Sequence, residues 1–193
     1  MRNVRGVLFL DYVRMLKAHK GVEWEAILTP DDVQYLKKQI DTTAWYPMAT
    51  FERMGNAILR FVAGDKMLPV QLWGRFSAAQ LRSAHPMLLA PKDPCETLTR
   101  FRVMRETFFD FEALQVLMLH EGESQIAIHY YMGMPAEEAA SYQTMGFFEG
   151  LLELAGAKDI RATFKAKQWQ GAPRTLLDLR WITPEAAKPK PGR

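Results

Sequence analysis

The sequence predicts an α+β fold in which an N-terminal helical layer packs on a C-terminal antiparallel sheet. Two observations lead to this prediction. Apolar residues recur at helical spacing up to about residue 107, and beyond it the pattern changes to short apolar runs and strict alternation. The second half then reads as two strands, a helix and two more strands (ββαββ). That order is typical of helices gathered on one side of an antiparallel sheet.

The first half contains stretches with helical spacing, separated by turn residues. Residues 6–19 are apolar on most sides, which predicts a buried helix. A second helix is expected to begin at residues 29–32, because the Thr-Pro-Asp-Asp sequence supplies a cap, a first-turn proline and two acidic side chains. Residues 51–62 form one apolar face, and another helix starts near Pro69. After a proline-rich connection, a further helix is expected from Pro94.

The second half shows the patterns of two hairpins around one helix. Residues 113–119 and 125–131 are short apolar runs joined by Glu-Gly-Glu, which indicates a hairpin. Residues 136–155 have the pattern of a helix ended by Gly156. Residues 160–167 and 177–181 then alternate between apolar and polar, as strands with one buried and one wet face do.

Composition indicates one globular domain over residues 1–182 and a disordered tail, rich in Pro and Lys, over residues 183–193. The 193 residues are 48% hydrophobic and 24% charged, the balance of an ordinary globular protein. The net charge of +3 is too small to indicate nucleic acid as a partner. No apolar run is long enough for a signal peptide or a membrane helix, so we expect a cytoplasmic protein without membrane insertion.

The common catalytic and nucleotide-binding motifs are missing from the sequence. It contains no phosphate-binding loop, no dinucleotide fingerprint, no nucleophile elbow and no zinc-protease motif, which predicts no enzyme activity and no cofactor. His120 and His129 lie on opposite strands of the first hairpin, but about six residues of strand would separate them by roughly 20 Å. No metal site is therefore expected.

The single cysteine, Cys95, excludes an internal disulfide and suits a reducing compartment. Its place beside a helix start could lower its pKa and make it reactive. The absence of a neighbouring His or second Cys in the sequence favours a small apolar filler instead.

The last hairpin carries a basic face. Arg161, Lys165, Lys167 and Arg180 are expected to project together, with Asp178 as the only acid among them. Such charges protect an edge strand from pairing with another chain. They could also dock an acidic protein partner. The sequence favours protection.

Gly146 and Gly150 lie four residues apart within a predicted helix, where each costs about 1 kcal/mol relative to Ala. Such a cost is tolerated where the helix backbone closely approaches the sheet beneath, a second subunit or a ligand, and sheet packing is favoured. Aromatic residues and this glycine pair form the candidate ligand pocket or interface. Its members are Trp45, Tyr46, Phe51, Trp73, Tyr142, Gly146, Phe147 and Gly150.

The segment from Gly146 to Ile160, which leads into a hairpin closing on Leu179-Arg180-Trp181, resembles the C-terminal part of a known family. This is an uncharacterised family of paralogous proteins best known from myxobacteria. It is distantly similar to haem-NO-binding and 4-vinyl reductase (V4R) domains. Residues 5–9 and 45–47 are also similar to it. The resemblance implies the fold of the ligand-binding domains of NO signalling and Golgi transport proteins, with helices packed on an antiparallel sheet.

The cofactor residues of these relatives do not carry over to this sequence. The haem domains bind iron through a His in the helix before the first hairpin, and residues 98–106 contain no His. Their Tyr-x-Ser-x-Arg motif would fall near residues 131–135, which lack both Ser and Arg. V4R domains often have cysteines in the last hairpin, and residues 160–182 contain none. Haem and a cysteine-bound metal are therefore both disfavoured.

Two functions without catalysis remain. The first is a sensory or regulatory domain that binds a small apolar ligand between helices and sheet. It is motivated by the resemblance and by the supply of Trp, Phe and Met. The second is a dimeric interaction module without a ligand, with the glycine pair and the basic face as its surfaces. A haem-binding protein is the less favoured third alternative.

Overall fold

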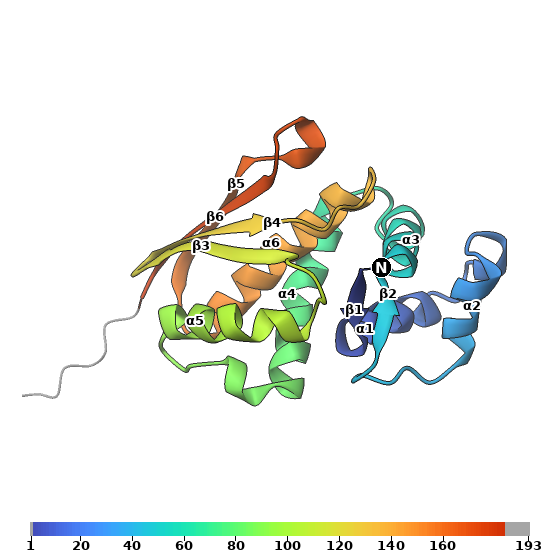
Figure 1. Ribbon diagram of the computed structural model, residues 1–193, viewed down its shortest axis with the longest axis horizontal. Helices are drawn as coiled ribbons and strands as arrows, with labels where there is room; N and C mark the ends of the chain where they lie inside the picture. The colour runs from blue at the N-terminus through green and yellow to red at the C-terminus, as the bar shows by residue number, and fades with distance from the viewer. Residues whose placement is uncertain (1, 184–193) are drawn as a thin grey trace, which may run out of the picture.

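The computed structural model describes residues 2–183, which form two parts lying side by side (Figure 1). The expected tail, Thr183 apart, lies outside the described residues. The N-terminal part contains β1 (Asn3–Arg5), α1 (Gly6–Ala18), η1 (Trp24–Ala26), α2 (Pro30–Lys37), β2 (Trp45–Pro47) and α3 (Met48–Phe61). The C-terminal part contains α4 (Met67–Ala84), η2 (Pro86–Leu88), α5 (Pro94–Met104), η3 (Arg105–Thr107), β3 (Leu114–His120), β4 (Glu123–Ile128), α6 (Ala136–Leu154), β5 (Lys158–Ala166), η4 (Gln168–Gln170) and β6 (Thr175–Ile182).

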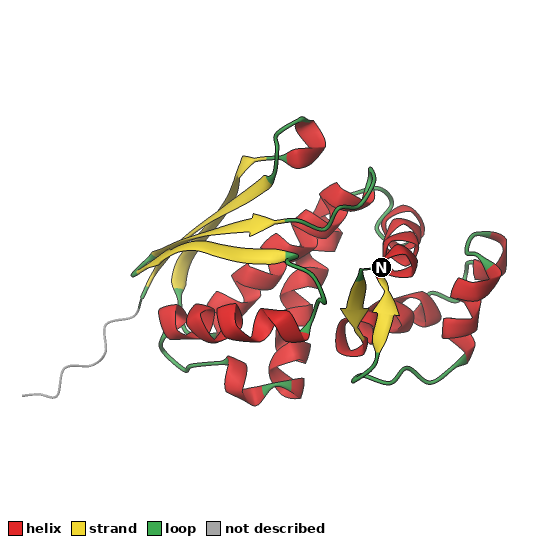
Figure 2. Cartoon of the chain, in the orientation of Figure 1, coloured by secondary structure: helices red, strands yellow, loops and turns green. Residues whose placement is uncertain are grey.

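The predicted mixture of helices and antiparallel sheet is confirmed, but the first-half helices do not all form one layer. The four strands pair in the order β3-β4-β6-β5, with every neighbour antiparallel. Helices α5 and α6 contact this sheet, and α4 packs on α6 (Figure 2). Helices α1, α2 and α3 instead lie beside the sheet, in the N-terminal part. This part has a small sheet of its own, because residues 45–47 pair with β1.

Local sequence explains where the predicted helices begin. The Thr29 hydroxyl accepts a hydrogen bond from the Asp32 amide at 3.3 Å, so Thr29 caps α2 as expected. Asp93 caps α5 in the same way, accepting from the Glu96 amide at 2.8 Å. In both helices a proline occupies the first turn. A backbone N–H at that position has no acceptor within the helix, so its absence from proline costs no hydrogen bond.

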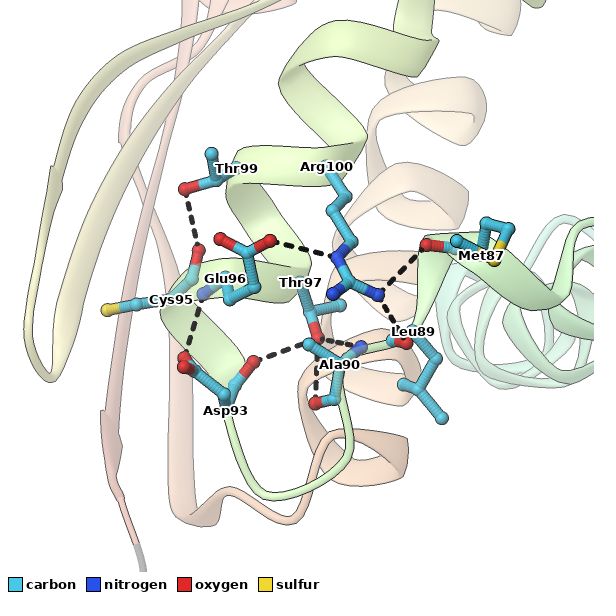
Figure 3. Close-up of polar contacts among 9 residues, drawn as sticks. All are labelled: Met87, Leu89, Ala90, Asp93, Cys95, Glu96, Thr97, Thr99 and Arg100. Carbon is cyan, nitrogen blue, oxygen red and sulfur yellow. Dashed lines mark hydrogen bonds and ion pairs between the residues drawn. The ribbon is translucent and has the colours of Figure 1, made fainter.

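Helix α5 is tied to the proline-rich segment that precedes it (Figure 3). The Arg100 guanidinium donates to the Glu96 carboxylate at 2.9 Å and to the backbone oxygens of Met87 and Leu89 at 3.2 and 3.0 Å. The same guanidinium thus links α5 to the segment that contains Met87 and Leu89. The next helical residue, Phe101, is buried in the core.

Helices α4 and α6 approach each other backbone to backbone. A methyl group on Gly146 would lie 1.8 Å from the Gln71 carbonyl oxygen, and one on Gly74 would lie 1.9 Å from the Gln143 carbonyl oxygen. Gly150 likewise faces α4, next to Arg75. The expectation that the sheet occupies the space beside Gly146 and Gly150 is therefore wrong, because that space is taken by a helix.

Hydrogen bonds and apolar packing join the two parts. The Arg5 amide donates to the Phe108 carbonyl at 2.8 Å, and the Tyr12 hydroxyl donates to the Gln143 side chain at 2.5 Å. One cluster of buried apolar side chains extends through both parts. None of the helices in residues 2–183 is both long and apolar enough to cross a membrane.

Candidate functional site

The candidate site is a cavity of about 90 Å³ at the junction of the two parts. Residues of α1 and α3 line the cavity on one side. Residues of α4, α5, α6 and the start of β3 line it on the other. Its apolar lining includes Leu8, Phe51, Leu81, Phe101, Phe108 and Phe147. The sequence led us to expect a space between helices and sheet, whereas this lining comes mainly from helices and loops, with Leu114 of β3 as its strand residue.

The size of the cavity limits what it can hold. An engineered cavity of about 150 Å³ lined by apolar side chains binds benzene or xenon. Pockets for drug-sized molecules measure about 300–1,000 Å³. At about 90 Å³ the present cavity has room for a few heavy atoms.

Aromatic contacts hold the cavity walls in place. The Tyr12 ring lies 3.8 Å from the Phe51 ring and 4.7 Å from the Trp73 ring, centroid to centroid. On the opposite wall, Phe101 packs edge-on against Phe148 at 4.9 Å and lies 5.7 Å from Phe147. These rings come from α1, α3, α4, α5 and α6, so the shape of the cavity depends on all five helices.

The one charged side chain in the described lining is Asp11, which is half-buried in α1. Its Oδ2 atom accepts hydrogen bonds from Trp73 Nε1 at 3.1 Å and from the Ser77 hydroxyl at 2.7 Å. Both donors belong to α4. Asp11 therefore links the N-terminal part to α4 at the edge of the cavity.

Two tyrosine hydroxyls also lie in the lining, and both are hydrogen-bonded to α6. Tyr12 donates to Gln143, and the Tyr130 hydroxyl lies 2.5 Å from that of Thr144. Burial raises the pKa of Tyr12 well above its ordinary value, and the nearby Tyr130 and Asp11 raise it further. Burial also raises the pKa of Tyr130, against the opposing hydrogen bond to Thr144. Both side chains therefore stay protonated at neutral pH.

The structure brings some of the sequence-predicted pocket residues to this cavity. Phe51 and Phe147 line it directly. Trp73 borders it through the hydrogen bond from its indole to Asp11. Trp73 also lines a separate void of about 20 Å³ between α3 and α6, which is enough for about one water molecule.

The other predicted pocket residues lie elsewhere. Trp45 is 41% exposed beneath the Arg5 guanidinium. Tyr46 stacks on Phe9 at 4.4 Å within the N-terminal part. Tyr142 packs against Phe164 of the sheet at 5.2 Å. With Gly146 and Gly150 turned toward α4, five of the eight predicted residues thus have packing roles away from the cavity.

The basic side chains of the last hairpin are grouped around an acid. Arg161 and Arg180 are directly opposite in the register of β5 and β6. Lys165 and Arg180 both approach the Asp178 carboxylate, at 3.8 and 3.4 Å. Lys167 lies beyond the end of β5, over the Trp169 ring. Because β5 is an edge strand, this arrangement supports protection of the edge over docking of an acidic partner.

The remaining chemistry-bearing side chains do not form a site. The Cys95 thiol donates to the His120 carbonyl at 3.3 Å, and burial raises its pKa, as do Asp93 and Glu121 nearby. A reactive thiolate is therefore disfavoured. Within residues 2–183, no three His, Cys, Asp or Glu side chains are gathered closely enough to hold a metal ion. His120 pairs with Glu123 across the turn of the first hairpin.

Sequence reasoning missed most of the polar lining, including Asp11, Tyr12, Tyr130 and Thr144. For Asp11 a signal was present. It interrupts an otherwise apolar run in a helix that is buried on most sides. A carboxylate at such a position needs hydrogen-bond donors from another element, and these donors are found on α4.

Comparison with known proteins identifies the fold. No protein-family model matches the chain, and no curated protein is similar to it. Among solved structures, an H-NOX protein from S. oneidensis in the Fe(II)NO ligation state has a TM-score of 0.63 at 14% identity, covering 92% of this chain and 98% of that one. An oxygen-binding H-NOX domain related to soluble guanylate cyclases has a TM-score of 0.61 at 11% identity, covering 97% and 100%.

The class defined by the fold is thus a helix-and-sheet domain, with a small apolar cavity where its two parts meet. More particularly, the fold is that of H-NOX domains. The distant similarity to haem-NO-binding proteins expected from the sequence is confirmed at the level of the fold.

Proposed function

We propose that this protein is a sensory or regulatory domain without catalytic activity, and that residues 1–182 act as one unit. In this proposal it binds a small, mainly apolar ligand in the cavity between its two parts. The observation that carries the proposal is the cavity of about 90 Å³, which is lined by aromatic and aliphatic side chains with a few polar groups. The likeness to H-NOX domains, one in an Fe(II)NO ligation state and one in complex with oxygen, supports a ligand-binding role for this fold. A regulatory role follows from the junction, because an occupant would touch both parts at once.

Haem, the group named for one of the structural neighbours, does not fit the residues of this cavity. The described lining offers no His, Cys or Met as an axial ligand. Its tyrosines are protonated and hydrogen-bonded, and no Lys or Arg lines the space to pair with propionates. The volume of about 90 Å³ is also far too small for a porphyrin. Failure of the purified chain to develop a Soret band with haemin would agree with this reasoning, and a stoichiometric Soret band would contradict it.

Two measurements test ligand binding. Native and denatured mass spectra of protein purified gently from its source would show a bound small molecule as extra mass in the native spectrum alone. Independently, xenon added to the apo protein should shift the NMR signals of the Leu8, Leu81 and Leu114 methyl groups, since xenon enters apolar cavities.

A cavity-filling variant sharpens the second measurement. Ala140→Leu places three extra carbons beside the cavity and should abolish the xenon shifts. Ala26→Leu adds the same side chain at an exposed position and should leave them unchanged. Methyl shifts that are absent in the unaltered protein, together with no bound mass, would contradict the proposal.

The second candidate function is a dimeric interaction module, and one observation favours it. Leu68, Leu72 and Phe76 recur every four residues along α4 and are 66%, 54% and 58% exposed. They form an apolar row on the side of α4 that no other described element covers. We expect a second copy of the chain to cover this row. Sedimentation should then show a dimer that Leu72→Glu converts to monomer, and a monomer at high concentration would remove this function.

A further inference from the structure

The described lining of the cavity contains one acidic side chain, that of Asp11. Asp11 lies at the edge of the cavity, with Oδ2 bound to Trp73 and Ser77. Within residues 2–183, Asp11 Oδ1 has no hydrogen-bond donor assigned to it, and no Lys, Arg or His belongs to the lining. The Tyr12 and Tyr130 hydroxyls are engaged with α6, and Gln143 accepts from Tyr12 through Oε1, which leaves the Gln143 amide group as the uncharged donor in the lining. A ligand that enters therefore meets an acceptor with spare capacity and negative charge, and no cationic partner for that charge.

The walls beside this carboxylate are largely aromatic. They include Tyr12, Phe51, Phe101, Phe108 and Phe147. The faces of aromatic rings attract cations, and groups of rings are a recurrent means of binding ammonium ions. A carboxylate next to several rings thus discriminates against anions and favours a positively charged group.

Building on the ligand-binding role proposed above, we propose that the ligand is a small organic amine, bound as its ammonium ion. The ammonium group donates to Asp11 Oδ1, and the alkyl body lies among the phenylalanine rings. The volume of about 90 Å³ restricts the body to a short alkyl chain. This assignment makes Asp11 a binding residue in addition to a link between α1 and α4.

Three probes of five heavy atoms each test the charge preference. They are butylammonium, 1-butanol and propionate, which match in size and differ in charge. Titrations of ¹⁵N-labelled full-length protein would follow the indole N–H signal of Trp73, which donates to Asp11 and so reports on this carboxylate directly. We expect butylammonium to bind at least tenfold more tightly than 1-butanol, and propionate to bind more weakly than either.

Asp11→Asn tests whether the carboxylate is responsible. The amide oxygen of Asn still accepts from Trp73 and Ser77, so the link to α4 persists while the charge is lost. The variant should lose the tenfold preference for butylammonium and keep its affinity for 1-butanol. Glu23→Gln removes one negative charge at an exposed site outside the cavity lining and serves as the matched control, with the preference unchanged.

The outcomes separate this inference from the proposed function. Equal binding of all three probes, or tighter binding of propionate, would overturn the amine assignment and leave the cavity as a ligand site. No binding of any probe, with no xenon shift, would overturn both. If Asp11→Asn fails to fold, the ranking of the three probes on the unaltered protein still decides the question.

Discussion

Helix α6 takes part in two contacts of opposite character. On one side Gly146 and Gly150 bring its backbone against α4, leaving no room for even a methyl group. On another side Ala140 and Phe147 face the N-terminal part across a cavity of about 90 Å³. The comparison teaches that the space at the junction is not loose packing typical of the whole molecule. The backbone of α6 is in direct contact with that of α4, whereas a cavity separates α6 from the N-terminal part.

The largest effect is expected from a side chain placed in the tight contact. Gly146→Leu would force apart backbones that already exclude a Cβ at 1.8 Å, and should lower the free energy of unfolding by at least about 4 kcal/mol. Gly21→Leu, at a site with nothing within 4 Å, should change it by no more than about 0.5 kcal/mol. Urea unfolding measures both free energies. Similar stabilities for the two variants would contradict a tight backbone contact between α4 and α6.

A smaller loss is expected from enlarging the cavity. Phe101 is 1% exposed, and Phe101→Ala should cost about 3–4 kcal/mol. Unlike the glycine substitution, this loss should be partly reversed by benzene, because the vacated space joins a cavity that accepts it. Val103→Ala on the same helix, at a side chain that is 73% exposed, is the control for helix α5. Thermal unfolding with and without benzene gives the answer, and an unchanged Tm would count against a continuous cavity.

Alkaline pH tests the two buried tyrosines at the junction. Tyr12 and Tyr130 have folded-state pKa values raised by burial, so their contribution to stability is complete below the unfolded value of about 10 and is lost as pH rises through the folded value. Stability should therefore begin to fall as the pH rises above about 10, where tyrosines of the unfolded chain ionise while these two stay protonated in the folded state. Tyr130→Phe should show a smaller decline between pH 9 and 11, because one of the two buried hydroxyls is removed. A decline as steep as that of the unaltered protein would place its origin elsewhere.

The smallest effect concerns the link at Asp11. Ser77→Ala removes one of two hydrogen bonds to Asp11 Oδ2 and should cost about 1 kcal/mol. Ser83→Ala, on the exposed part of the same helix, removes only a bond to its own helix backbone and should be close to neutral. Equal stability of both variants would mean that Asp11 does not hold the two parts together.

Most elements were predictable from sequence because their signals are local, although the short strands β1 and β2 were not predicted. Thr29 and Asp93 cap helices through their own neighbours, and alternation along residues 160–167 reports the half-buried and exposed faces of β5. The way in which the elements pack together was not predictable, because it depends on contacts between residues far apart in the sequence. Nothing around Gly146 says that its neighbour is Gln71, some 75 positions earlier in the chain, and the sheet was expected there instead.

Some residues of the candidate site were likewise predictable from sequence, and others were not. Phe51 and Phe147 were found because large aromatic side chains are the usual lining of a pocket. Trp45 and Tyr142 share that chemistry and pack elsewhere, since aromatic character alone does not select the surface that a side chain faces. Asp11 was passed over as an interruption in an apolar run, although its donors Trp73 and Ser77 give it a fixed place beside the cavity.

The glycine contact between α4 and α6 also has a mechanical consequence. Two helices whose backbones touch cannot move closer together, so a push on one toward the other is passed on to its partner. A molecule that pushes on Ala140 or Phe147 from inside the cavity must therefore displace α4 along with α6. The row of Leu68, Leu72 and Phe76 lies on the outer side of α4, so an event in the interior would be carried to the surface as a shift of this apolar row.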